Sequence, residues 1–179
     1  MTEDKEIIQA IRKNPEKGFR LFMDKYKKPV YWHIRRLVVS HADAQDVAQE
    51  TFIRIFRSFS QCRDDNSFKA WIYRIATREA LRLMESRHNE GSFSLEQAEA
   101  NVNRLPADEY IDYSDLESVK LQRAIRSLPT KQQLVFNLRY YDELRYEEIA
   151  EIAACTAQSA KANYHIAKEK IIHYMNSNE

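Results

Sequence analysis

The chain is poor in residues that interrupt helices, since its 179 residues include only two glycines and four prolines. Proline fits the first turn of a helix or the segment after its end, so we expect Pro15, Pro29, Pro106 and Pro129 at the edges of elements. No segment shows the alternation of apolar and polar residues that marks a half-buried strand. The sequence therefore predicts an all-α fold.

Other absences bear on function. Cys62 and Cys155 are far apart and lack CxxC spacing, which argues against a disulfide framework and against a zinc site. No apolar run approaches the roughly 18 residues of a membrane span, and the start MTEDKEII lacks the layout of a secretory signal. There is no phosphate loop or HExxH motif, and the five histidines show no ligand spacing. We therefore expect a cytoplasmic protein without stable membrane insertion that is not an enzyme and has no catalytic residue, cofactor or metal.

Charge is distributed unevenly along the chain, although the formal net charge is only +1. Residues 1–89 carry a net charge of +6, residues 90–117 one of −7, and residues 118–179 one of +2. The acidic middle contains Gly91, Pro106, several Ser and Asn, and little apolar periodicity, which is typical of a linker. We therefore expect two small helical domains, 1–89 and 118–179, joined by an acidic linker, 90–117.

Apolar residues recur at helical spacing throughout the first domain. Three short helices are predicted before residue 40, with the apolar sets Ile7, Ile8 and Ile11, then Phe19, Phe22 and Tyr26, then Val30, Ile34, Leu37 and Val38. A stronger pattern begins at Ala42, and Ser40 is its expected N-cap. Its apolar stripe comprises Ala44, Val47, Ala48, Phe52, Ile55, Phe56 and Phe59.

A polar loop from Ser60 to Ser67 precedes a further predicted helix. Its core face comprises Phe68, Trp71, Ile72, Ile75 and Ala76. Arg74, Arg78 and Arg82 follow one another at i+4 and therefore line up on one side, with Lys69 and Tyr73 nearby. Guanidinium groups among aromatic rings are typical of surfaces that follow a phosphate backbone and stack unpaired bases. An ordinary solvated face explains this row equally well.

Three stretches in a fixed order carry a resemblance to a known family. DAQDVAQETFIRIF, SFKAWIYRIATREAL and, after the acidic segment, SLPTKQQLVFNLRYYDELRYEEIAEI resemble bacterial RNA polymerase sigma factors of the extracytoplasmic-function (ECF) group. The resemblance extends from about Phe19 to Met175. It implies a region 2 domain that binds the polymerase clamp and melts the minus-ten element, and a region 4 domain that reads the minus-thirty-five element. It also implies a linker directed toward the polymerase active site and an inhibitory anti-sigma factor.

The resemblance also implies roles for individual residues of region 2. The loop from Ser60 to Ser67 matches one that captures a flipped promoter base, and the helix from Lys69 to Arg82 matches the strand-separating surface. The implied polymerase-binding residues are Asp43, Asp46, Gln49, Glu50 and Ile53. The implied DNA-binding residues of region 2 are Arg63, Asn66, Lys69, Tyr73, Arg74, Arg78 and Arg82. Arg78 stands where the family usually has Asn, and Arg82 stands where it often has Asp. Both arginines shift this surface toward phosphate contact.

One helix of the second domain is predicted to begin after Pro129. Thr130 and Gln133 fit a capping box, and Leu134, Val135 and Leu138 continue its core stripe. The next helix starts at Arg145, where a Ser or Thr cap is usual. At the following turn the family commonly has Gly, whereas this chain has Ala154, so we expect a turn wider than usual.

The last predicted helix begins at the N-cap Thr156 and has the inward face Ala160, Tyr164, Ala167 and Ile171. The opposite face and its margins carry the expected region 4 DNA-binding residues, which are Gln158, Ser159, Lys161, Ala162, His165 and Lys168. Short polar groups near a helix N-terminus, with cations beside them, are typical of a recognition helix. Taken alone, this segment is equally well explained as a generic helical hairpin.

The whole chain predicts a transcription initiation factor that is monomeric when free. Its expected partners are core RNA polymerase, promoter DNA in double-stranded and melted form, and an anti-sigma factor. The main alternative is a self-sufficient helix-turn-helix regulator, which would bind a two-fold site as a homodimer. A helical adaptor, the second alternative, would show no dependence on DNA.

Overall fold

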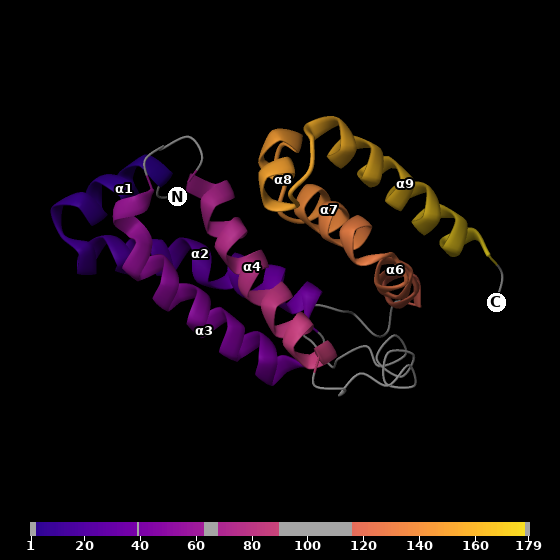
Figure 1. Cartoon of the computed structure of the whole chain (residues 1–179), viewed down its shortest axis with the longest axis horizontal. Coiled ribbons are helices and arrows are strands. Elements are labelled where there is room, and N and C mark those ends of the chain that lie inside the picture. The colour runs from indigo at the N-terminus through magenta and orange to yellow at the C-terminus, as the bar shows by residue number, and fades with distance from the viewer. Residues whose placement is uncertain (1–2, 39, 63–67, 90–115, 178–179) are drawn as a thin grey trace. The chain divides into compact units, whose positions relative to one another are not determined.

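The computed structural model describes residues 3–38, 40–62, 68–89 and 116–177, with 87–89 described by their backbone alone. Within these ranges the regular secondary structure is helical (Figure 1). The helices are α1 (Asp4–Lys13), α2 (Pro15–Leu37), α3 (His41–Ser58), the short 3₁₀ helix η1 (Phe59–Gln61), α4 (Phe68–Asn89), α6 (Leu116–Arg126), α7 (Thr130–Tyr140), α8 (Tyr146–Ile152) and α9 (Ala157–Asn176). The all-α prediction is confirmed. The chain divides into two compact units, Met1–Met84 and Glu85–Glu179, and most of the predicted linker lies outside the described residues.

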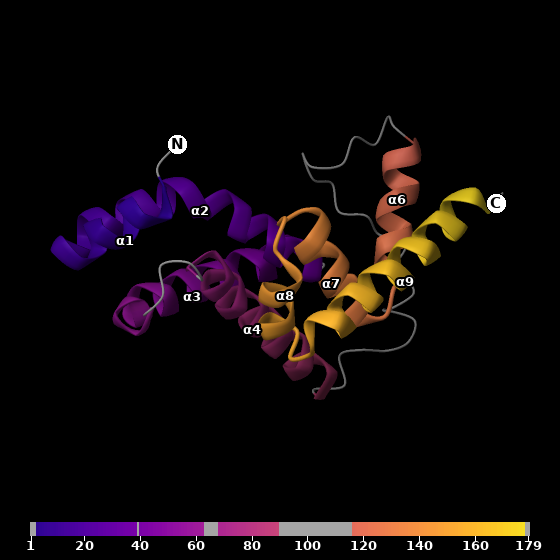
Figure 2. The ribbon, with the colours of Figure 1, turned by 90° about the horizontal axis from the view of Figure 1, so that it is seen from above.

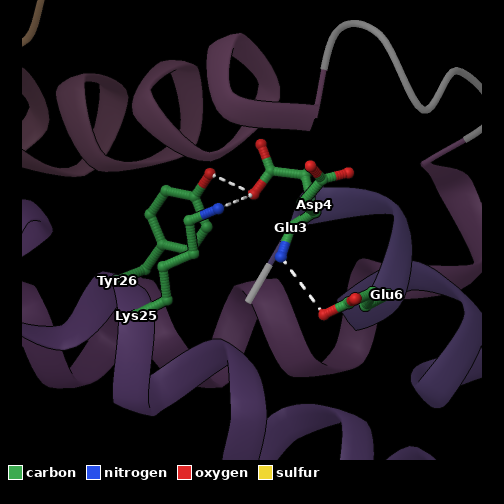
Figure 3. Close-up of polar contacts among 5 residues, drawn as sticks. All are labelled: Glu3, Asp4, Glu6, Lys25 and Tyr26. Carbon is green, nitrogen blue, oxygen red and sulfur yellow. Dashed lines mark hydrogen bonds and ion pairs between the residues drawn. The ribbon is translucent and has the colours of Figure 1, made fainter. Parts of the chain in front are cut away.

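Helices α1 and α2 form an antiparallel hairpin at the start of the first unit. Asn14 ends α1 and caps α2 by accepting a hydrogen bond from the backbone N–H of Lys17 at 3.0 Å. At the far end of the hairpin, one carboxylate oxygen of Asp4 accepts hydrogen bonds from Lys25 Nζ at 2.8 Å and from the Tyr26 hydroxyl at 2.7 Å (Figure 3). Burial, together with the hydrogen bond to Asp4, raises the pKa of the Tyr26 phenol. Tyr26 therefore remains a neutral donor and fixes α1 against α2.

Gly18→Ala should destabilise the first unit, because α2 approaches the backbone of α1 closely at this position. A Cβ atom on Gly18 would lie 2.3 Å from the backbone nitrogen and 2.4 Å from the Cα of Ile11, and backbone atoms cannot rotate away as a flexible side chain can. Overpacking typically costs about 1–3 kcal/mol, and each kcal/mol lowers the unfolding midpoint of a domain of this size by roughly 4–8 °C. Thermal unfolding followed by circular dichroism measures the change, with Lys17→Ala at the exposed neighbouring position as the control. An unchanged midpoint for Gly18→Ala would contradict the close approach.

Pro29 does not end a helix, so the prediction of two elements between residues 15 and 38 is wrong. Helix α2 continues through Pro29 for 23 residues in all. An internal proline removes one backbone hydrogen bond and costs about 3 kcal/mol. Here the ring is exposed, while Tyr26, Val30 and Ile34 continue one buried stripe on both sides of it. Core packing along this stripe offsets the lost hydrogen bond.

The core of the first unit is rich in aromatic rings from three elements. Phe22 of α2 is fully buried and its ring centroid lies 6.4 Å from that of Phe68 in α4. Phe68 in turn stacks on Trp71 at 6.0 Å, and Phe59 of η1 lies 6.1 Å from Trp71. Trp71 is therefore a core residue, as predicted from its position on the apolar face of this helix.

The second unit is built around α9, which α6, α7 and α8 contact (Figure 2). Its core contains Ala124, Ile125, Leu128, Phe136, Ala167 and Ile171. Helix α6 lies beside the C-terminal half of α9, where Lys120 Nζ donates a hydrogen bond to the Ser177 carbonyl at 2.6 Å. The predicted core residues Leu134, Val135 and Leu138 are buried.

The start of α7 differs from the predicted capping box. Pro129 is the N-cap residue and Thr130 already has helical geometry, so the threonine hydroxyl is one position too late to cap the helix. No side-chain hydrogen bond caps this end. The first turn instead begins with the bond from the Gln133 N–H to the Pro129 carbonyl at 2.9 Å.

Candidate polymerase and nucleic-acid surfaces

One side of α3 presents the residues for which polymerase binding is expected. The N-cap prediction is confirmed, because Ser40 Oγ accepts from the Asp43 N–H at 3.4 Å. Asp46, Gln49, Glu50 and Ile53 are exposed and Asp43 is half-exposed. Their spacing of three and four residues places all five on one side of the helix. The structure therefore brings this predicted set together.

An apolar patch, formed by Ile53 and Phe56, adjoins this acidic side of α3. The predicted apolar stripe included Phe56, yet 43% of that residue is exposed, and Ile53 is 38% exposed. The Phe56 ring meets Phe19 of α2 edge to face, with 4.9 Å between ring centroids. Residue spacing alone did not predict that Phe56 is exposed while its neighbour Ile55 is buried. Aromatic residues at both margins of the apolar stripe make the stripe look wider in the sequence than the buried face is. The patch adds apolar area to a side that otherwise carries three acids and Gln49.

The arginine row of α4 is accessible to solvent over most of its length. Arg74 is half-buried, whereas Arg78 and Arg82 are exposed. Solvent exposure of the row therefore increases toward the C-terminal end of the helix. Lys69 does not belong to this row. It precedes Arg74 by five positions, and in an α-helix this separation places the two side chains about 140° apart around the axis. Instead, Lys69 Nζ lies 5.9 Å from the centroid of the Tyr73 ring. Arg63 and Asn66, the loop residues predicted to contact DNA, lie outside the described residues.

Tyr73 departs from the expectation that it contributes an exposed ring for base stacking. Only 2% of the residue is exposed, and its ring packs edge to face on His33 with 5.0 Å between centroids. His33 is itself buried and shares a hydrogen bond of 2.8 Å with Thr77 Oγ1. A ring held in this way has no free face for a base. Tyr73 therefore serves the core, because α4 buries the side on which position 73 falls.

Glu79 is a member of the α4 surface that the sequence analysis missed. It lies between Arg78 and Arg82 in sequence and is only 8% exposed. Its Oε1 lies 3.1 Å from Arg54 Nε of α3, and its Oε2 lies 3.8 Å from Arg82 Nη1. The arginine row thus contains a buried acid. An acid three residues before Arg82 is the sequence signal that could have revealed this pairing.

A tight turn joins α8 to α9, which contradicts the expectation of a wide one. Ala154 adopts the left-handed conformation, with φ of 49°. The Cys155 N–H bonds to the Ala150 carbonyl at 3.0 Å, which closes the turn as a Schellman motif. The left-handed conformation costs a non-glycine residue roughly 1 kcal/mol. The hydrogen bonds of the motif and the burial of Ile149 offset this cost.

The start of α8 lacks a Ser or Thr cap and is closed by a glutamate. The backbone N–H of Arg145 donates to Glu148 Oε2 at 2.7 Å. The Arg145 guanidinium also pairs with this carboxylate, with Nε at 3.4 Å. Arg139 supports the preceding segment by donating to the Leu144 carbonyl at 2.9 Å and by lying 5.0 Å from the centroid of the Tyr146 ring. These contacts hold α8 in place ahead of α9.

Helix α9 has the two faces that the sequence predicts. Thr156 Oγ1 accepts from the Ser159 N–H at 3.1 Å, so the predicted N-cap is confirmed. Its inward residues are buried, except for half-buried Tyr164, whose pKa is raised by burial and further by Tyr146. The outward set Gln158, Lys161, Ala162, His165 and Lys168 is exposed.

Two polar contacts modify this outward face. The Asn163 amide donates to the Ser159 carbonyl at 2.9 Å and lies 3.3 Å from Ser159 Oγ, so half-buried Ser159 is already engaged. His165 Nε2 lies 3.2 Å from Glu169 Oε1. An exposed acid therefore stands beside the predicted base-contacting histidine, and it orients the imidazole along the helix.

Two family models match the chain, and they cover parts of both units. The model for sigma-70 region 2 matches residues 22–90, and that for sigma-70 region 4 matches residues 118–171. These two regions, in this order and on helical units of this kind, define a protein of the sigma-70 class.

Curated relatives narrow the class further. The chain is 30% identical over 176 residues to the ECF RNA polymerase sigma-E factors of Escherichia coli K12 and Salmonella typhimurium LT2, covering 94% of this chain and 92% of theirs. It is 26% identical over 184 residues to the RNA polymerase sigma-H factor of Pseudomonas aeruginosa, with the same coverage. The chain belongs to the ECF group of RNA polymerase sigma factors. It is a transcription initiation factor.

Solved structures share its fold. The sigma factor RpoE of Bartonella quintana, determined with the anti-sigma factor NepR, matches with a TM-score of 0.73 at 18% identity and covers 91% of this chain and 99% of its own. CnrH, determined with the cytosolic domain of CnrY, matches with a TM-score of 0.72 at 15% identity and covers 98% of this chain and 99% of its own. Each likeness concerns the fold.

None of the described helices is long and apolar enough to cross a membrane. Among the described residues, His, Cys, Asp and Glu side chains form no group of three or more that could hold a metal ion.

Proposed function

We propose that this sigma factor uses three of its helices for three separate contacts during initiation. The acidic side of α3, with Ile53 beside it, binds the core polymerase. The arginines of α4 bind the opened strand of the minus-ten element, and α9 reads the minus-thirty-five element in the major groove. The observation that carries the proposal is the exposure of these chemically different faces, acidic on α3 and polar with cations on α9.

The domain limits proposed from the sequence are 1–89, 90–117 and 118–179. They put the proposed polymerase and minus-ten contacts in the first domain and the minus-thirty-five contact in the second. Because the linker is acidic, we propose that it lies in a basic channel of the polymerase. The protein acts as a monomer in the cytoplasm, without stable membrane insertion, cofactor or metal. The relatives RpoE and CnrH were determined in complexes, and an anti-sigma factor is the corresponding regulator proposed for this chain.

Run-off transcription tests the proposed function. Core polymerase is incubated with genomic fragments in the presence and absence of this protein, and we expect defined transcripts only in its presence. Absence of any protein-dependent transcript, combined with specific DNA binding by a homodimer without polymerase, would favour the self-sufficient regulator instead. Analytical ultracentrifugation of the free protein supplies the oligomeric state.

Substitutions on α9 should separate base reading from phosphate binding. Gln158 lies in the first turn, where its amide can pair with adenine, and such a pair contributes about 1–3 kcal/mol of discrimination. Gln158→Ala should therefore weaken binding to some upstream-element variants and not to others. Lys161→Ala should weaken all variants alike and lower the salt dependence by about one unit, as expected for a lost phosphate contact.

Competition binding of the holoenzyme on upstream-element variants measures both effects. Lys170→Ala is the matched control, because Lys170 is a lysine of the same helix whose Nζ contacts Gln132 Oε1 of α7 at 3.0 Å. His165 is expected to add a base or phosphate contact. If Gln158→Ala affected every variant equally while Lys161→Ala changed base preference, the proposed orientation of α9 in the groove would be wrong.

A further inference from the structure

The buried carboxylate of Glu79 joins the two functional surfaces of the first unit. Burying a carboxylate is costly unless a cation neutralises it. Glu79 obtains this neutralisation from Arg54 of α3, whose Nε lies 3.1 Å away, and more weakly from exposed Arg82, whose Nη1 lies 3.8 Å away. Arg54 is therefore the main counter-charge, and it belongs to the helix proposed to bind polymerase.

Arg54 is also held by Glu50, one of the proposed polymerase-binding residues. Its Nε–H donates a hydrogen bond to Glu50 Oε1 at 2.9 Å, one turn earlier on the same helix. The same nitrogen thus lies 2.9 Å from the Glu50 carboxylate and 3.1 Å from the Glu79 carboxylate. One N–H group cannot make two full hydrogen bonds. Glu50 and Glu79 therefore compete for the Nε–H group of Arg54.

From this arrangement we infer that Glu79 is a positioning residue for polymerase docking, which it promotes by taking over Arg54 when Glu50 is drawn to the polymerase. In the free protein the Glu50 carboxylate is occupied by Arg54, so docking through Glu50 must break that contact. Because the Glu79 carboxylate is already 3.1 Å from Arg54 Nε, the guanidinium keeps a carboxylate partner without a large movement. The inference depends on the proposed docking role of Glu50.

Glu79→Gln isolates this role because glutamine has nearly the same shape and no charge. In this variant Arg54 has Glu50 as its remaining carboxylate in the network, so docking would leave its charge without a carboxylate partner. We expect the affinity for core polymerase to fall by about two- to fivefold, the range of one partly exposed ion pair. Adding Arg54→Gln removes the cation that docking would leave without a carboxylate partner, so affinity should return to at least the wild-type value.

The experiment is an equilibrium titration of the full-length protein against core polymerase. It compares wild type with Glu79→Gln, with Glu79→Gln plus Arg54→Gln, and with Glu79→Gln plus Arg57→Gln. Arg57 is an exposed arginine of the same helix, so the last variant controls for the change in net charge and should not restore affinity. Thermal unfolding of each variant is measured in parallel. A merely structural role for Glu79 would alter the unfolding midpoint and would not be rescued by Arg54→Gln.

Two outcomes would overturn the inference: wild-type affinity in Glu79→Gln, or failure of Arg54→Gln to restore the affinity that Glu79→Gln loses. Glu50→Gln tests the underlying proposal separately. If Glu50→Gln leaves polymerase affinity unchanged, the docking role of Glu50 is wrong and the inference falls with it. If Glu50→Gln weakens binding while Glu79→Gln does not, docking through Glu50 stands and the role of Glu79 alone is refuted.

Discussion

Asp46→Lys combined with Glu50→Lys should reduce the affinity for core polymerase by at least about tenfold, because like charges that face each other at an interface cost several kcal/mol. Both side chains are exposed on one side of α3, so the exchange need not disturb the core. Arg54 retains Glu79 as a partner after Glu50 is lost. The folded structure should therefore survive while the docking surface changes sign.

Equilibrium titration against core polymerase measures this loss, and circular dichroism checks the fold. Glu16→Lys combined with Asp24→Lys is the matched control, since it changes the net charge equally at two exposed acids of α2. The control should bind within about twofold of wild type, as expected for charges outside the contact. Unchanged affinity of the α3 variant, with its fold intact, would show that polymerase docks elsewhere.

Alanine at Arg78 and Arg82 should impair promoter opening more than polymerase binding. Each cation that contacts a phosphate of a single strand contributes about 0.7 to the slope of log affinity against log salt concentration, so losing two contacts should lower the slope by about 1.4. Adding Arg74→Ala should extend the effect. Because Arg74 is half-buried, the pair Arg78 and Arg82 gives the cleaner measurement.

Permanganate reactivity of promoter thymines reports the opened strand directly, and polymerase affinity is measured alongside. Lys27→Ala with Lys28→Ala provides the control, because it removes two exposed cations of α2 and thus the same net charge. Should the arginine variant show thymine reactivity equal to wild type, the arginine row of α4 would have no part in melting.

Much of this architecture follows from local sequence patterns. The helix starts at Ser40 and Thr156 were predictable because an N-cap depends on a side chain and on an N–H three residues later. The two faces of α9 were predictable because its small and aromatic residues keep a strict helical period. Signals of this kind act within one element, so they survive whatever packs around it.

The errors concern features that other elements decide. Pro29 appears as a helix end when read alone, yet the stripe from Tyr26 to Ile34 keeps α2 continuous. Tyr73 was assigned to a nucleic-acid surface by its neighbours in sequence, but His33 of another helix covers its ring. Ala154 adopts a left-handed conformation that its residue type disfavours, because the turn is stabilised by its backbone hydrogen bonds. Glu79 was overlooked because its principal partner is 25 residues away on α3.

The hairpin of α1 and α2 has a consequence for work with isolated fragments. The family match for region 2 begins at residue 22, which is inside α2 and after the whole of α1. A fragment cut at that boundary would lose Ile7 and Ile8, which are buried, and would leave the Tyr26 hydroxyl without the Asp4 carboxylate that accepts its hydrogen bond. The part of the chain that the region 2 family model matches is therefore smaller than the part that folds together, and the cooperative unit should be taken from Asp4 onward.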